Sequence, residues 1–274
     1  MGNRVVQRSL VFGGVTTLLA FLFWAIGCAP AGSSQQPPSA SVDVAIVNER
    51  AGEDATQMEL LGTVVLAHGW HTYWINPGDA GMPPRLAWSG PGEVREQATW
   101  FEIPQRILEG DLTTLGYYDT LRFTTTLTVA GGEALPLHLR LTLLLCKEEC
   151  VPVVCSTTVR SGAPRGIPAQ TAARLTSLLP QQQHALGTRV QVTDAHVVFT
   201  VTGVDAEGEA WDLFPIDAGA YNLKVQPQVT ARGDTLELRL ERGVPALALG
   251  PLVSGVLVRG GGGERRGYYL AARL

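Results

Sequence analysis

The sequence lacks the hallmarks of several large functional classes. Its net charge is −4 and its isoelectric point is near 5.8, so it has no basic excess of the kind that binds nucleic acid. It contains no G-x-S-x-G motif, which presents the serine nucleophile in many hydrolases. The chain has only four cysteines, and no cluster at zinc-finger spacing accompanies them. These absences exclude a nucleic-acid partner, serine hydrolysis by that motif and a zinc-finger fold.

Beyond residue 28 the sequence also lacks any apolar run long enough to cross a bilayer, which takes about 20 residues. Residues 1–28 read as an export signal, because Arg4 and Arg8 precede an apolar run from Leu10 to Gly27. We therefore expect the rest of the chain to lie outside the cytoplasm.

The apolar run ends in Ala25-Ile26-Gly27-Cys28, which resembles the lipobox of bacterial lipoproteins, with alanine where leucine is usual. The cysteine of a lipobox becomes the lipidated first residue of the mature protein, so Cys28 is the candidate lipidation site. An uncleaved anchor and plain cleavage of the signal are the alternatives. Residues 29–41 are rich in Ser, Gln and Pro and predict a flexible tether between the membrane and the folded chain.

Short alternating segments separated by Gly and Pro dominate the rest of the chain and predict β structure. They lie at 58–67, 71–75, 98–103, 119–130, 135–146, 151–159, 190–204, 235–242, 254–260 and 267–274. The run Gly260–Gly263 predicts a hairpin turn, since no helical pattern follows it as in a phosphate-binding loop.

The spacing of these segments predicts two folded parts. Residues 42–160 are expected to form one β-sandwich and residues 188–274 a second, smaller one. Residues 161–187 break the strand rhythm and predict a linker with a short helix. Two loops rich in turn residues, 76–84 and 109–116, are candidates for function, which long ordered loops often carry.

Alternation along residues 137–160 indicates where three cysteines point. The leucines at odd positions from Leu137 to Leu145 form the apolar row, so Cys146 is predicted on the polar side of its strand. Cys150 likewise falls on the polar side of the returning strand. Cys155 shares the apolar row of that strand, and we interpret it as a buried thiol.

A bond between Cys146 and Cys150 needs a chain reversal. Residues four apart on one straight strand lie about 13 Å apart, whereas a disulfide tolerates a Cα separation of about 7 Å. A hairpin loop of Lys147, Glu148 and Glu149 would place the cysteines opposite each other, about 4.5–5.5 Å apart. In that loop Lys147 would lower a neighbouring thiol pKa, and the two glutamates would oppose it. An oxidising compartment lets such a pair persist as a disulfide.

Three segments together resemble the amino-terminal periplasmic domain of the DsbD and ScsB family of thiol:disulfide interchange proteins. They are HTYWINPGDAGMPP at 71–84, GYYD at 116–119 and CKEECVP at 146–152. The resemblance implies an immunoglobulin-like sandwich whose two cysteines shuttle reducing equivalents, followed in ScsB-like members by a further β domain. The expected fold class is therefore all-β, with two immunoglobulin-like β-sandwich domains joined by a linker that contains a short helix.

The resemblance also implies roles for individual residues. Cys146 and Cys150 match the redox pair, and Cys150 matches the cysteine that forms the mixed disulfide with partners. His71 and Tyr73 match strand positions whose aromatic side chains border the pair, and Tyr117 of GYYD is expected in the same surroundings.

The loop 112–116 lies where the family keeps a cap over the active site. Leu112 and Leu115 stand there, in place of the aromatic residue that shields the disulfide in the best-studied branch. No cofactor and no resident metal are implied.

The main functional hypothesis is a membrane-anchored periplasmic thiol:disulfide oxidoreductase. By analogy with the family, it would take electrons from a membrane-embedded thiol reductant transporter and pass them to periplasmic thioredoxin-like proteins, both supplied as separate proteins. One alternative is a non-catalytic envelope lipoprotein or binding module whose hairpin disulfide is structural. Another is a copper-handling accessory protein, with the two hairpin cysteines and His71 or His138 as soft ligands.

Overall fold

The computed structural model describes residues 39–131, 133–161, 186–206, 209–217, 221–243, 248–260 and 265–274. All regular structure in these ranges is β-strand. The short helix predicted within 161–187 and the candidate lipidation site Cys28 lie outside the described residues. The described part contains no helix that could span a bilayer.

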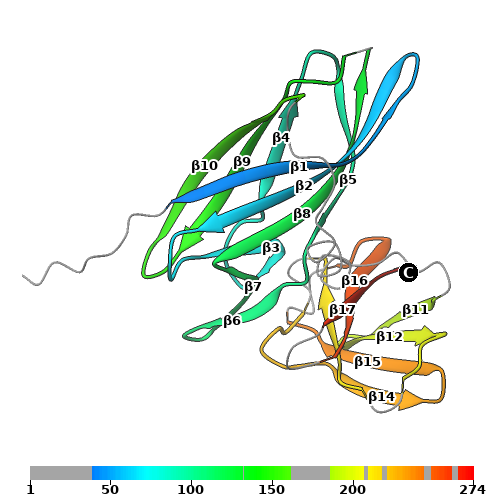
Figure 1. Cartoon of the computed structure of the whole chain (residues 1–274). Helices are drawn as coiled ribbons and strands as arrows, with labels where there is room; N and C mark the ends of the chain where they lie inside the picture. The colour runs from blue at the N-terminus through cyan, green and yellow to red at the C-terminus, as the bar shows by residue number, and fades with distance from the viewer. Residues whose placement is uncertain are drawn as a thin grey trace, which may run out of the picture. The chain divides into compact units, whose positions relative to one another are not determined.

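The first ten strands form two antiparallel sheets (Figure 1). One sheet has the order β1-β2-β8-β5, and its strands are β1 (Ala40–Ala51), β2 (Ala55–Leu66), β8 (Thr120–Ala130) and β5 (Val94–Phe101). The other has the order β10-β9-β3-β7-β6, with β4 also paired to β9. Its strands are β10 (Cys150–Val159), β9 (Leu137–Cys146), β3 (His71–Gly78), β7 (Leu112–Tyr118), β6 (Gln105–Glu109) and β4 (Arg85–Ser89).

The core of this pair of sheets follows from strict alternation. Along β8 every second side chain is buried, and Leu121 and Phe123 are fully enclosed. They share one apolar cluster with Leu141 and Leu143 of β9, so the two sheets face each other across it. Gly62 of β2 leaves room for a ring there, since a Cβ at this position would lie 2.1 Å from Cζ of Phe123.

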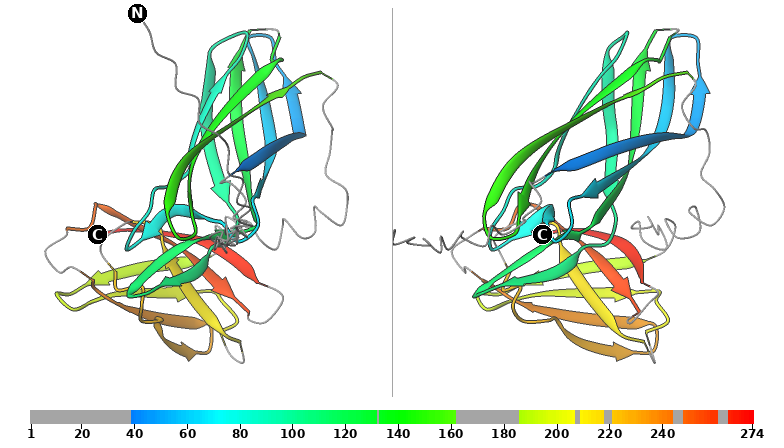
Figure 2. Two further views of the ribbon diagram at one scale, coloured as in Figure 1. Left: turned by 90° about the vertical axis from the view of Figure 1, so that its left-hand side faces the viewer. Right: turned by 60° about the vertical axis from the view of Figure 1, so that its left-hand side comes forward.

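Seven further strands form a second group of sheets (Figure 2). Four strands have the order β11-β12-β15-β14, namely β11 (Gly187–Val192), β12 (His196–Thr202), β15 (Thr235–Glu241) and β14 (Gln228–Arg232). Three have the order β13-β16-β17, namely β13 (Trp211–Pro215), β16 (Leu252–Arg259) and β17 (Arg266–Arg273). The antiparallel pairing of β16 with β17 fits the predicted hairpin after Gly260, although residues 261–264 lie outside the described ranges.

Six strands were not predicted from the alternation. They are β1, β4, β6, β7, β13 and β14. Four of them, β4, β6, β13 and β14, have only five residues, which is too short for alternation to be recognised. The predicted tether also ends early, because Ala40 and Ser41 already belong to β1. The predicted loop 109–116 is instead the tight hairpin between β6 and β7, which turns at Gly110 with a φ of 61°.

Polar contacts connect the two groups of sheets. Arg106 of β6 forms a two-pronged ion pair with Asp212 of β13, with Nη2 at 2.9 Å from Oδ1. The Arg106 guanidinium also lies 4.6 Å from the ring centroid of Phe214. Asn76 of β3 donates from Nδ2 to the carbonyl oxygen of Pro215 at 2.8 Å.

Candidate functional site: a disulfide at the end of a hairpin

The hairpin between β9 and β10 carries a disulfide. Cys146 and Cys150 are direct register partners, and Lys147, Glu148 and Glu149 form the loop between them. The amide of Lys147 donates to the carbonyl oxygen of Glu149 at 3.1 Å and closes the turn. The Cα atoms of the two cysteines lie 4.1 Å apart. The predicted hairpin and pairing are therefore present.

The two sulfurs differ in exposure, and this corrects the prediction that both point into solvent. Cys150 is exposed, whereas Cys146 is only 1% exposed. Alternation along β9 holds, since Thr142 and Leu144 on the same face are partly exposed. Cys146 is nevertheless covered, because the neighbouring strand β3 pairs with it at this end of the sheet and places a side chain over its sulfur. Alternation predicts on which face of the sheet a residue lies, but it does not predict whether another side chain buries the residue on that face.

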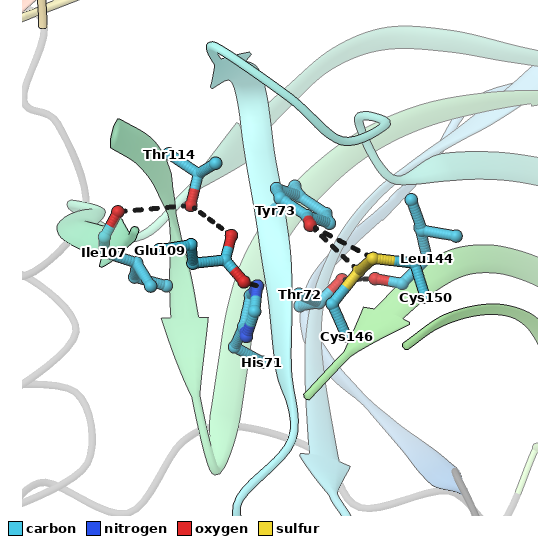
Figure 3. Close-up of polar contacts among 9 residues, drawn as sticks. All are labelled: His71, Thr72, Tyr73, Ile107, Glu109, Thr114, Leu144, Cys146 and Cys150. Atoms are coloured by element: carbon cyan, nitrogen blue, oxygen red, sulfur yellow. Dashed lines mark hydrogen bonds and ion pairs between the residues drawn. A yellow bond between two sulfur atoms is a disulfide. The ribbon is translucent and has the colours of Figure 1, made fainter. Parts of the chain in front are cut away.

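The side chain that buries the sulfur of Cys146 is Tyr73 of β3. Its hydroxyl donates a hydrogen bond to Sγ of Cys146 at 2.9 Å and lies 3.8 Å from Sγ of Cys150 (Figure 3). Burial, and to a lesser degree the charge of Glu109, raise the pKa of Tyr73 to about 12, so its hydroxyl stays a donor at physiological pH. Gly81 lies behind the ring, where a Cβ would come within 2.3 Å of Cε1 of Tyr73.

One row of four residues crosses the sheet through the disulfide. Tyr118 of β7 pairs with His71 of β3, His71 pairs with Cys146 of β9, and Cys146 pairs with Cys150 of β10. Cross-strand partners share a face and lie about 5 Å apart. His71 is 2% exposed, and its ring makes edge contacts with the rings of Tyr73 and Tyr118, at centroid distances of 5.3 and 5.5 Å.

A carboxylate approaches this row from β6. Oε1 of Glu109 lies 3.5 Å from Nε2 of His71 (Figure 3). Oε2 of the same carboxylate accepts a hydrogen bond from the hydroxyl of Thr114 at 3.4 Å. Burial lowers the pKa of His71, and the negative charge of Glu109 opposes that shift.

Three predicted neighbours of the disulfide lie elsewhere. Tyr117 is buried in the core and donates from its hydroxyl to the carbonyl oxygen of Glu102 at 2.6 Å. It pairs with Thr72, one position out of phase with the row, so Tyr118 takes the place expected for it. Leu112 and Leu115 belong to strand β7 rather than to a cap loop. Leu115 is fully buried in the core, and Leu112 is 44% exposed at the start of the strand.

The hairpin residues and the third cysteine lie where the pattern placed them. Lys147, Glu148 and Glu149 are exposed, and the end of the Lys147 side chain lies over Gly69. Cys155 is buried, and its thiol donates to the carbonyl oxygen of Ala40 at 3.3 Å. Burial raises the pKa of this thiol, which makes it less reactive. The prediction of a buried thiol at position 155 is confirmed.

The sequence interpretation missed Glu109, Tyr118 and Gly81. Counting the phase of β7 against β3 would have selected Tyr118 over its neighbour, but only with the register known. Nothing local marks Glu109, which lies 38 positions from His71 along the chain. Within the described ranges, no group of three or more His, Cys, Asp or Glu side chains is arranged to hold a metal ion.

Comparison with known families identifies the part of the chain that carries this hairpin. Residues 41–160 match the family model described as "Thiol:disulfide interchange protein DsbD, N-terminal". These residues form a DsbD N-terminal domain. The domain comprises the two sheets built from β1 to β10. Its family and its Cys146–Cys150 disulfide together support thiol:disulfide interchange as the general activity.

Solved structures extend the likeness beyond the DsbD N-terminal domain. The N-terminal periplasmic domain of ScsB from Proteus mirabilis matches with a TM-score of 0.55 and 20% sequence identity, over 84% of this chain and 99% of that chain. Residues 41–160 are 120 of the 274 residues, so the shared fold includes part of the second group of sheets. A structure titled BspA_C_mut, at 7% identity over 88% of this chain and 99% of that chain, has a TM-score of only 0.14. No curated protein matches the sequence.

Proposed function

We propose that this chain is a periplasmic electron relay. The Cys146–Cys150 pair would alternate between disulfide and dithiol, taking electrons from a membrane-embedded thiol reductant transporter and passing them to thioredoxin-like proteins. Membership of the DsbD N-terminal family supports the exchange chemistry. The periplasmic origin of the structurally similar ScsB domain and the signal-like residues 1–28 support the compartment, with Cys28 as the lipid anchor.

The unequal exposure of the two sulfurs is the observation that carries the proposal. Exchange requires a thiolate to attack one sulfur of a disulfide in line with the bond, while the other sulfur leaves. Here only Cys150 is exposed to a visiting protein, and Cys146 is enclosed beneath Tyr73. A bond that encloses five residues adds only about 2 kcal/mol through loop entropy, so stapling the hairpin explains little of its presence.

The exchange then proceeds in two balanced steps. A thiolate of the reduced donor attacks Sγ of Cys150, the intramolecular S–S bond breaks, and its electron pair leaves on Sγ of Cys146. The second donor thiol loses its proton and attacks the donor sulfur of the mixed disulfide, and Cys150 leaves as a thiolate. Protons from solvent complete the protein dithiol, and the donor becomes a disulfide. Electron transfer to a thioredoxin-like acceptor is the reverse sequence on the acceptor disulfide.

Trapping of mixed disulfides tests this relay. In the full chain with Cys146→Ser, the mixed disulfide at Cys150 has no internal thiol to resolve it, so covalent complexes with thioredoxin-like proteins should accumulate in the periplasm. Non-reducing electrophoresis with mass spectrometry of the complexes is the measurement.

The matched control is Cys150→Ser, which leaves the enclosed sulfur of Cys146 and should trap at least tenfold less protein. In a variant with both hairpin cysteines replaced by serine, any complex that is still trapped measures the background reaction through Cys155. Equal trapping by the two single variants, or no thiol-reducible complex with Cys146→Ser, would contradict the proposal and leave the hairpin disulfide as a structural bond.

A further inference from the structure

His71 combines deep burial with an unpaired nitrogen beside the reactive disulfide. Its Nε2 atom is enclosed and makes no hydrogen bond within the described residues. The nearest acid, Glu109, holds Oε1 at 3.5 Å, which is ion-pair distance but outside the geometry of a hydrogen bond. Buried polar atoms are normally paired, so an unpaired one next to an active site calls for a functional reason.

The groups around His71 are negatively charged or neutral, so they favour a positive charge on its ring. On β6 the neighbour is Glu109, whose side chain is 29% exposed and therefore reaches solvent. On β3 and β7 the neighbours are the neutral rings of Tyr73 and Tyr118. On β9 the register partner is Cys146, which becomes an anion when the disulfide opens. In the hairpin loop beside Cys146, Lys147 carries a positive charge, and the end of its side chain lies near Gly69.

The charge of Cys146 changes during the reaction, and that change acts on His71. A thiolate formed at a site that is 1% exposed is poorly solvated and needs a compensating positive charge or a proton. Tyr73 supplies one hydrogen bond but keeps its own proton. An imidazolium on the direct cross-strand partner of Cys146, with Glu109 on its other side, supplies the missing charge.

We propose that His71 is a positioning residue for the exchange reaction, which takes up a proton beside Glu109 and so stabilises the thiolate leaving on Cys146. The inference rests on the relay proposed above and adds a pH response to the same site. In the first step, the electron pair of the S–S bond passes to Sγ of Cys146 while Nε2 of His71 holds a proton drawn from solvent. When the thiolate itself is protonated, His71 returns to the neutral form.

The pH dependence has a defined sign. Burial lowers the pKa of His71 below its ordinary value of 6.5 in the oxidised protein, so the side chain is neutral at pH 8. A neutral imidazole adds no charge, and its contribution to the rate should then be small. As the pH falls toward 5, the imidazolium becomes populated as the thiolate forms, and the contribution to the rate should grow.

The test compares reduction rates of the full chain in detergent by dithiothreitol, a small dithiol, between pH 5 and pH 8. Samples are quenched with acid and alkylated, and the reduced fraction of the Cys146–Cys150 pair is measured by peptide mass. The ionisation of dithiothreitol is the same with every variant. The ratio of wild-type rate to variant rate at each pH therefore cancels the pH dependence of the reagent and leaves that of the protein. For His71→Asn, we expect this ratio to rise at least fivefold from pH 8 to pH 5.

Two further variants keep the test decisive. Glu109→Gln removes the charge that favours the imidazolium from a partly exposed position, and it should reproduce most of the rise even if His71→Asn folds poorly. His138→Asn, at an exposed histidine bonded to Thr158 on the same sheet, should leave the ratio flat. A flat ratio for both His71→Asn and Glu109→Gln would overturn the inference. Failure of dithiothreitol to reduce the wild-type pair at any pH would instead count against the relay itself.

Discussion

At the scale of single residues, the site is built from two cysteines with different tasks. Cys150 meets the partner, and Cys146 holds the charge that the reaction creates in an enclosed position. Tyr73 serves the second task, since its hydroxyl donates a hydrogen bond to the enclosed sulfur of Cys146 and its ring shields that sulfur from solvent. A hydrogen bond to a charged group is worth about 1.5–3 kcal/mol, so this one contact should be visible in the kinetics.

Replacing Tyr73 by phenylalanine tests that contact. Tyr73→Phe keeps the ring and removes the donor to Sγ of Cys146. The leaving thiolate loses stabilisation of at least about 1.5 kcal/mol, which corresponds to at least about a tenfold slower reduction by dithiothreitol at pH 8. Tyr118→Phe, whose ring also touches His71, is the control and should stay within about twofold of wild type. An unchanged rate for Tyr73→Phe would show that the ring acts only as a cover.

At the scale of strands, β3 is the element that assembles the site. It lies between β9 and β7, and it supplies both His71 and Tyr73. Thr72, between them, turns to the other face and donates its hydroxyl to the carbonyl oxygen of Leu144 at 3.1 Å, which holds β3 against β9. On the β7 side, Gly116 is the register partner of Tyr73 and has no side chain.

Gly116→Ala should force β3 and β7 apart. An added Cβ would lie 2.0 Å from the carbonyl oxygen of Thr72, and a backbone atom cannot move aside as a side chain can. We expect the free energy of unfolding to fall by about 2 kcal/mol, as measured by urea denaturation. Gly250→Ala is the control, since its Cβ would meet its nearest neighbour at 3.8 Å, and it should change stability by less than about 0.5 kcal/mol. Equal effects of the two substitutions would contradict the packing argument.

At the scale of the whole molecule, the second group of sheets is attached to the strands that carry the site. Arg106 lies on β6, three positions before Glu109, and Asn76 lies on β3, three positions after Tyr73. Arg265 adds a hydrogen bond from Nη1 to the carbonyl oxygen of Pro104 at 3.0 Å. Through these contacts the second group of sheets can hold β3 and β6, the strands that carry His71, Tyr73 and Glu109, in position.

Asp212→Ala should weaken this attachment. The substitution leaves the guanidinium of Arg106 without its carboxylate partner, at a side chain that is only 15% exposed. Breaking an enclosed pair is costly, so we expect a loss of about 2 kcal/mol in the free energy of unfolding. Glu237→Ala breaks a pair with Arg239 whose side chains are 46% and 45% exposed, and should cost under about 1 kcal/mol. The expectation is wrong if urea midpoints move equally for both variants.

Local alternation determined much of this protein by itself. The leucine row of β9, the charged loop and the valine row of β10 predicted the hairpin, the partnership of Cys146 with Cys150 and the burial of Cys155. These features depend on neighbours within a few positions along the chain, where a period of two assigns each side chain to a face. The core strands β2, β8 and β9 were predicted for the same reason.

Only the tertiary structure decided what lies over and beside the disulfide. Cys146 is buried because β3, 73 positions away at Tyr73, lies against the end of the hairpin. Tyr118 rather than Tyr117 joins the site because the register between β3 and β7 sets the phase, and Glu109 arrives through the turn at Gly110. A strand's own alternation states which residues share a face, but pairing between distant strands determines which neighbours that face meets.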